Sequence, residues 1–182
     1  MRVNFNKNDV HTQHTSFKAK TDIAKRFAAL GVNEIAGLEG DVAGVYQKFL
    51  KDEDAIRKIG DDFTHISVFP ALGGYGARHI ITNVTYDRGL QETVEKKQGF
   101  FKALLGKTHK PIQKDVPPVE IERYHDCNGD VDVKVEDLYT KILRIIVKDV
   151  EDARVTRELQ EQLVAKHNEE LSKKNTVLNN MI

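Results

Sequence analysis

The sequence predicts an α+β domain in which helices cover a small antiparallel sheet. Near the N-terminus and over the C-terminal third, apolar residues recur at the three- and four-residue spacing of amphipathic helices. Between these regions, apolar and polar residues alternate with the period of two that is typical of half-buried strands. We expect an N-terminal helical pair, two β-hairpins at about 63–86 and 119–136, and a long C-terminal helix.

Composition limits the classes of protein to which the chain can belong. Its 182 residues are 40% hydrophobic and 31% charged, which is typical of a soluble globular protein with a core. Lys plus Arg and Asp plus Glu both number 28, so the net charge favours neither nucleic acid nor anionic membranes. No apolar run reaches the roughly 18 residues of a transmembrane helix. The single cysteine, Cys127, excludes an intramolecular disulfide framework, and we expect a cytoplasmic protein.

The chain divides into three parts. Residues 1–20 contain little to bury and no apolar core of a secretory signal, so we expect a flexible tail. Residues 21–152 form the α+β domain. Residues 153–182 are the distal part of the C-terminal helix.

Two helices and a short third one begin the domain. The first is expected over 21–30, where Asp22 can cap it and Gly31 ends it. The second begins near Asp41, and a brief helical turn follows at 55–59. The apolar stripe of the second helix consists of Val42, Val45, Tyr46, Phe49 and Leu50.

The first hairpin joins strands at 64–69 and 79–86 through a glycine-rich connection. His65 and His79 fall on the polar face of this hairpin, where we expect them to lie close together. That polar face is the candidate site of an enzyme, and an enzyme is one of the functions that we consider.

The segment after this hairpin returns to helical spacing over 90–105, and residues 107–118 read as a polar linker. Within it, residues 99–107 form a basic amphipathic stretch. Such a stretch can lie on an anionic membrane or in the groove of a partner, but its apolar residues are more typical of a core.

Residues 119–137 have two incompatible interpretations. In the first they form a hairpin that is closed by a three-residue turn, with Gly129 in the left-handed position. The register then places apolar residues on one face: Ile121 opposite Val135, Arg123 opposite Val133, and His125 opposite Val131. We favour this hairpin because the β-branched Val131 suits a strand.

In the second interpretation the same segment binds calcium. Oxygen-bearing residues recur at Asp126, Asn128, Asp130 and Asp132, and Asp137 occupies the twelfth position. The spacing resembles the loop and helix of dockerin modules, the single-helix relatives of EF-hands. That resemblance implies Asp126, Asn128, Asp130 and Asp137 as side-chain ligands of Ca²⁺. It places a glycine at the sixth position, where this sequence has Val131.

The C-terminal helix is expected from about Asp137 towards Leu178. Its first half carries a broad apolar stripe, which thins to isolated leucines among charges in the second half. About 40 residues would extend roughly 60 Å, whereas a domain of this size has a radius of gyration of about 16 Å. The helix therefore either breaks near 149–152 or projects and needs a partner.

The leading hypothesis for function is a non-enzymatic protein-interaction or scaffolding module. Its contact would be a protein partner, or self-association, through the C-terminal helix. The alternatives are a calcium-binding module at 126–137 and an enzyme that uses the sheet face around His65 and His79. No cofactor other than Ca²⁺ is expected.

Overall fold

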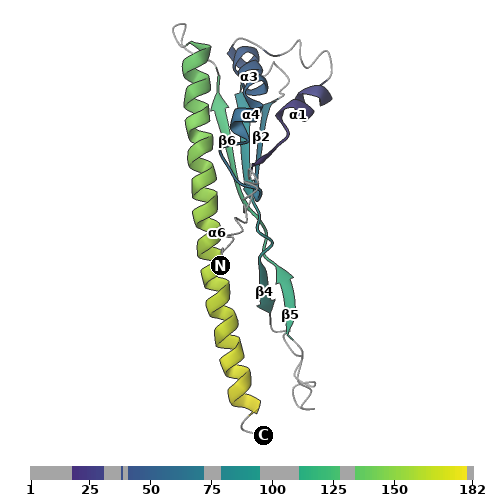
Figure 1. Ribbon diagram of the computed structural model, residues 1–182, viewed down its shortest axis with the longest axis vertical. Helices are drawn as coiled ribbons and strands as arrows, with labels where there is room; N and C mark the ends of the chain where they lie inside the picture. The colour runs from purple at the N-terminus through teal and green to yellow at the C-terminus, as the bar shows by residue number, and fades with distance from the viewer. Residues whose placement is uncertain are drawn as a thin grey trace, which may run out of the picture.

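The protein, seen in a computed structural model, contains a four-stranded sheet, a two-stranded arm and a very long helix (Figure 1). The structure describes residues 18–30, 38, 41–71, 79–94, 111–127 and 134–179. The strands of the larger sheet lie in the order β1 (Lys20–Thr21), β2 (Thr64–Ala71), β3 (His79–Tyr86) and β6 (Val119–Asp126). β1 runs parallel to β2, and the other neighbours are antiparallel. The predicted α+β class and the first hairpin are confirmed.

Helices cover one face of this sheet. They are α1 (Ile23–Ala29), α3 (Asp41–Lys51), α4 (Glu53–Ile56) and α6 (Val135–Asn179). The apolar stripe of α3 and the first half of α6 meet the inward face of β2 and β3 in one core. Its fully buried members include Val42, Val45, Phe49, Ile66, Val68, Ile80, Val84, Ile142 and Ile146. The predicted N-terminal helical pair and long C-terminal helix are thereby confirmed.

The predicted hairpin at 119–136 needs correction. Its first strand forms as β6, but β6 pairs with β3, so that Ile121 faces Val84 and His125 faces Ile80. Val135, its predicted partner, instead begins α6. There its methyl groups lie 3.1–3.2 Å from the position that a Cβ on Gly44 of α3 would occupy. Val135 packs on α3, and the edge of β3 is already paired with β6. Both contacts favour a helix over a second strand for the segment that begins at Val135. The turn at 128–133 lies outside the described residues.

A second small sheet continues the β3–β6 pair as an arm. It consists of β4 (Gln91–Val94) and β5 (Ile112–Asp115) in antiparallel pairing. The ladder is interrupted between the two sheets, where four residues on one side, 87–90, oppose three on the other, 116–118. Gly89 takes a φ of 68°, which suits glycine, and two prolines on the opposite side have no N–H to donate. The two-stranded ribbon that the β3–β6 pair and the arm form together therefore bends here.

The arm corrects two predictions. Residues 91–94 belong to a strand rather than to the helix expected over 90–105, and residues 112–115 of the predicted linker form its partner. Thr93 and Val94 are β-branched and favour the extended backbone once a partner strand is present. The remainder of the predicted helix, 95–105, lies outside the described residues.

The C-terminal helix is continuous. α6 runs for 45 residues from Val135 to Asn179 without the break considered at 149–152. At about 1.5 Å per residue it extends roughly 67 Å. Figure 1 shows its first half beside the large sheet and its second half beside the arm. The distal half is thus tied to the arm along its inner side.

Candidate functional site

Helix α6 has two faces with different surroundings. The inner face is buried against the sheet and the arm, and its buried apolar members are Leu138, Tyr139, Ile142, Ile146, Val150, Ala153 and Leu171. The outer face of the distal half carries an apolar row of Val155, Leu159 and Leu163, which are 43%, 55% and 68% exposed. A spacing of four residues places the three side chains in one line along the helix. We call these three residues the outer row.

The inner face of the distal helix is fixed to the arm by a buried arginine. Arg157 is completely buried and donates to the carbonyl oxygen of Pro117 at 2.9 Å. It also donates to Gln160 and, at 3.5 Å, to the carboxylate of Asp87. These groups flank the interruption of the ladder, where the Pro117 carbonyl lacks a strand partner. Arg157 thus joins α6 to the bend of the ribbon and holds the outer row in a defined orientation.

Further along the arm, polar contacts continue the attachment. The backbone N–H of Thr93 donates to Asn168 at 3.1 Å, and His167 lies 4.0 Å from Glu92. Nearer the bend, Arg88 lies 3.8 Å from Glu161. Among the described residues, the inner side of the distal helix is therefore in contact with the arm, and the outer side carries the exposed side chains.

A buried polar group also connects α6 to the large sheet. Asp149 is 1% exposed and accepts hydrogen bonds from Arg123 of β6 at 3.1–3.4 Å. This hydrogen bond and charge pairing raise the pKa of Arg123. His125 lies next in the same face of β6, with its Nε2 2.8 Å from Thr82 Oγ1. The Arg123–Asp149 contact spans the helix–sheet junction and the His125–Thr82 contact joins β6 to β3; both are structural, since Asp149 and His125 are buried.

We expect the stability of the protein to fall on acidification through His125. Burial lowers its pKa below 6.5; the Asp149 charge opposes this shift, and Arg123 and Lys141 add to it. Below about pH 6.5 the unfolded chain binds a proton that the folded chain does not, so the free energy of unfolding decreases as the pH falls.

Urea unfolding from about pH 7.5 to about pH 5 measures this contribution, which is limited to about 1.4 kcal/mol per pH unit for one proton. The loss should be smaller in His125→Gln than in the wild type. Equal slopes for the two proteins would contradict the assignment to His125.

The two histidines that were expected to converge lie far apart. In the β2–β3 register His65 faces Thr85, whereas His79 faces Ala71. Six residues of strand separate these positions, or roughly 20 Å at about 3.3 Å per residue. His65 lies 3.9 Å from Asp22, and His79 lies 3.9 Å from Asp126 at the other end. The prediction that they lie close together is wrong, because a shared face does not imply a shared position along the strand.

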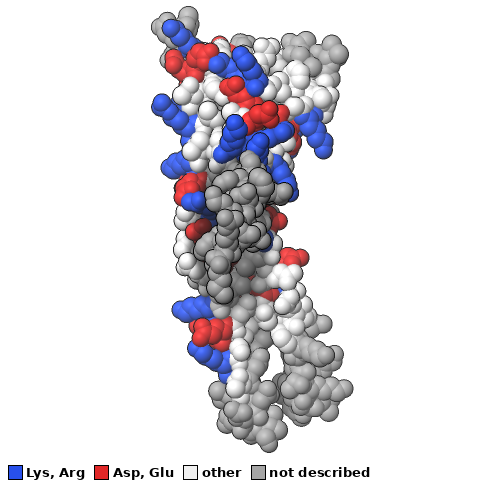
Figure 2. All heavy atoms as spheres, viewed as in Figure 1, with Lys and Arg blue, Asp and Glu red and all other residues white. Residues whose placement is uncertain are grey.

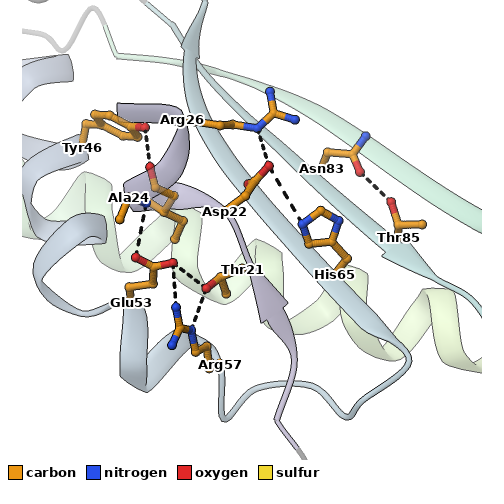
Figure 3. A network of polar contacts seen from close by, with 11 residues as sticks. Thr21, Asp22, Ala24, Arg26, Tyr46, Glu53, Arg57, His65, Asn83 and Thr85 are labelled. Atoms are coloured by element: carbon orange, nitrogen blue, oxygen red, sulfur yellow. Dashed lines mark hydrogen bonds and ion pairs between the residues drawn. The ribbon is translucent and has the colours of Figure 1, made fainter. Parts of the chain in front are cut away.

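His65 borders a polar network at the N-terminal edge of the sheet (Figure 3). Glu53 is buried there and accepts from Thr21 at 2.5 Å, from the N–H of Ala24 and from Arg57. Arg57 also donates to Thr21 at 2.8 Å. The network ties β1 and α1 to α4. Beside it, a shallow open depression of about 260 Å³ is lined by His65 together with Lys20, Asp62, Phe63, Thr64, Thr85 and Asp87.

The residues of the calcium interpretation are only partly described. Asp126 is the last residue of β6, and Asp137 lies in the first turn of α6, where its N–H donates to the carbonyl oxygen of Lys134. Asn128 and Asp130 lie outside the described residues. Within the described part of the chain, His, Cys, Asp and Glu form no group of three that could hold a metal ion.

Cys127 is placed for packing. Its side chain is 3% exposed and belongs to the core, and burial raises the pKa of its thiol to about 11. A thiol with that pKa is protonated at neutral pH and is a poor nucleophile.

Charges of both signs are mixed on the face of the molecule that Figure 2 shows. Figure 2 shows Lys and Arg interspersed with Asp and Glu over the sheet end and along α6. The basic stretch at 99–107, considered for membrane or groove binding, lies outside the described residues.

Sequence reasoning identified the distal leucines of α6 but did not separate them by face. Leu171 is 8% exposed, whereas Leu159 is 55% exposed. They are twelve positions apart, which at about 100° per residue places them about 120° apart around the helix. A helical projection could have found this difference. The burial of Arg157 has no signal in the local sequence, because its partners are 40 and 70 residues away.

No helix within the described ranges combines the length and the apolar composition needed to cross a membrane. Comparison of the chain with protein-family models, with curated protein sequences and with solved structures gives no significant match.

Proposed function

We propose that this chain is a non-enzymatic protein-interaction module that binds its partner with the outer face of α6. The observation that carries the proposal is the outer row, Val155, Leu159 and Leu163. These residues lie on the exposed side of α6, and the opposite side of the helix packs on the sheet and the arm. Apolar residues at i, i+4 and i+8 belong to one stripe of a helix, and such a stripe is what an amphipathic helix presents to a hydrophobic groove or to another helix. Single exposed apolar residues are common, but an aligned row is typical of a contact surface.

The attachment of α6 supports this function energetically. A preformed helix does not have to be ordered on binding, so less of the interaction energy is spent on conformational entropy. The Arg157 and Asn168 contacts hold the distal half against the arm, which keeps the outer row directed away from the sheet.

A photoreactive amino acid at position 159 tests the proposal. We expect a discrete cross-linked product with a protein partner when the label replaces Leu159 in the native cells. The matched control replaces Val147, which is 49% exposed on the same helix but lies about 120° around it from Leu159. Equal labelling from both positions, or from neither, would contradict a docking surface at the outer row.

A second candidate function is calcium binding at 126–137. The observation that favours it is the start of α6 at Val135, because the dockerin-like spacing implies a loop that leads directly into a helix. We expect calorimetric titration with Ca²⁺ to give saturable heat for the wild type and a much weaker response for Asp130→Asn. Asp115→Asn, on the exposed arm strand β5, is the matched control. Absence of heat and of thermal stabilisation in the wild type would rule this candidate out.

A further inference from the structure

We propose that the partner of the outer row is a second copy of this chain, bound antiparallel with Leu159 at the twofold axis. The inference rests on the proposed function, since it specifies what binds the outer face of α6. It is carried by the arrangement of charges around the outer row.

Four exposed charged residues extend the outer row along the same face of the helix. At about 100° per residue, all of them lie within about 20° of Leu159, and Val155 and Leu163 lie within about 40°. In chain order this face reads Lys148, Asp152, Val155, Leu159, Leu163, Lys166 and Glu170, each of them exposed. Within the described part of the chain none of the four forms an ion pair, although the Asp152 charge adds to the effect of Asp149 in raising the pKa of Arg123.

The order of these residues is self-complementary about Leu159. Lys148 and Glu170 lie eleven residues to either side of it, and Asp152 and Lys166 lie seven residues to either side. When two such helices pack antiparallel about Leu159, residues at equal distances from it face one another. Lys148 then faces Glu170, and Asp152 faces Lys166, on both sides of the axis.

The apolar residues follow the same symmetry. Val155 and Leu163 lie four residues to either side of Leu159, so each Val155 packs on a Leu163 and the two Leu159 side chains meet at the axis. The contact therefore has an apolar centre and a charged rim of alternating sign.

A parallel arrangement in register is disfavoured by the same residues. It would place every residue opposite its own copy, so that all four charged positions would face like charges. The complementary stretch also has a defined end. Beyond it, the exposed basic residues Arg144 and Lys174 lie fifteen residues to either side of Leu159 and would face one another, whereas Lys173 is paired with Glu169 of its own helix.

The rest of the fold is compatible with this contact. The sheet and the arm lie on the inner side of α6, as Asp149, Arg157 and Asn168 show, and the outer row lies on the other side. Two copies can join back to back with their sheets at opposite ends. The contact from Lys148 to Glu170 extends about 33 Å and is narrower than a standard interface, so we expect a weak, concentration-dependent dimer.

Sedimentation equilibrium of the full chain over a range of concentrations tests the association. We expect the mass to rise from one chain to two. Leu159→Asp should raise the dissociation constant at least about tenfold, whereas Val147→Asp should leave it unchanged. A single-chain mass up to about 1 mM, or an equal effect of the two substitutions, would overturn the proposal.

Charge reversal tests the antiparallel register. Asp152→Lys or Lys166→Asp alone places like charges opposite one another, so each variant should dimerise more weakly than the wild type. An equimolar mixture restores both pairs and should associate at least as well as the wild type. Circular dichroism must show that the variants retain their helix content. A mixture that remains as weak as its components would overturn the antiparallel arrangement.

Cysteine cross-linking gives an independent readout of direction. Under mild oxidation, Val155→Cys mixed with Leu163→Cys should form a disulfide between the two variants, and Val155→Cys alone should not. Preferential self-linking of Val155→Cys would indicate a parallel pair and overturn the proposal. The native Cys127 is buried, so its thiol should contribute little to the cross-linked products.

The photo-cross-linking experiment separates this inference from the proposed function. An adduct at position 159 with twice the mass of the chain supports both. An adduct with a different protein, together with a monomer in the centrifuge, supports the docking surface and overturns the self-association. No adduct and no dimer would overturn both.

Discussion

Replacement of Arg157 by alanine is expected to lower the free energy of unfolding by about 3 kcal/mol. The guanidinium is fully buried and is the donor to the Pro117 carbonyl and to Asp87. Its removal leaves a cavity and a buried carbonyl without a partner at the bend of the ribbon. Urea unfolding followed by circular dichroism measures the loss.

Two further variants show which part of Arg157 matters. Arg157→Met keeps the apolar stem but removes the donors, and we expect a loss of about 2 kcal/mol, because the variant avoids most of the cavity but still leaves the Pro117 carbonyl without a partner. Arg154→Ala, on the exposed side of the same helix, should cause no resolvable change. If Arg157→Ala is as stable as Arg154→Ala, the arginine does not hold the arm to the helix.

Hydrogen exchange localises the same effect. The N–H of Val116 donates to Leu90, and that of Thr93 donates to Asn168 of α6. In Arg157→Ala these two amides should exchange faster, whereas amides in the centre of β3 should keep their relative protection. Uniform acceleration throughout the chain would indicate global destabilisation rather than release of the arm.

Replacement of Glu53 by alanine is expected to lower the free energy of unfolding by about 2–3 kcal/mol. Its carboxylate accepts hydrogen bonds from Thr21, Ala24 and Arg57, and these donors belong to β1, α1 and the end of α4. Without it, β1 and α1 lose the hydrogen bonds that Thr21 and Ala24 donate to α4, while the Arg57–Thr21 bond and the β1–β2 pairing remain (Figure 3). Chemical unfolding measures the loss, and exchange of the Ala24 amide shows whether it is local.

The neighbouring carboxylate provides the control. Asp54, which is 94% exposed, lies 3.5 Å from the same arginine, so Asp54→Ala should have little effect. Glu53→Gln retains an acceptor and should lose less stability than Glu53→Ala. A Glu53→Ala variant as stable as Asp54→Ala would show that the network does not anchor the N-terminal segment.

Local pattern was sufficient for the elements whose partners lie nearby. The stripe from Val42 to Phe49 predicted α3, and the alternation around Ile66 and Ile80 predicted the β2–β3 hairpin. In each case periodicity shows which face is buried, and a short connection leaves few choices of neighbour.

Pairing over longer distances was not predictable in the same way. Alternation from Val119 to His125 indicated a strand, but the partner assigned to it was the adjacent segment rather than β3. Both partners offer alternating residues, so pattern alone does not choose between them. The position of Val135 against Gly44 decides in favour of the helix, and that contact joins residues about ninety positions apart.

The features of the candidate interface were likewise determined partly by the sequence and partly by the tertiary structure. By itself the sequence determined a long amphipathic C-terminal helix, the spacing of Val155, Leu159 and Leu163, and the mirrored charges around them. Only the tertiary structure decided which side of that helix is covered, because the burial of Arg157 and Leu171 and the hydrogen bond of Asn168 depend on an arm formed by distant residues. Helical periodicity fixes the angles between side chains, whereas contacts with other elements fix which of those angles face solvent.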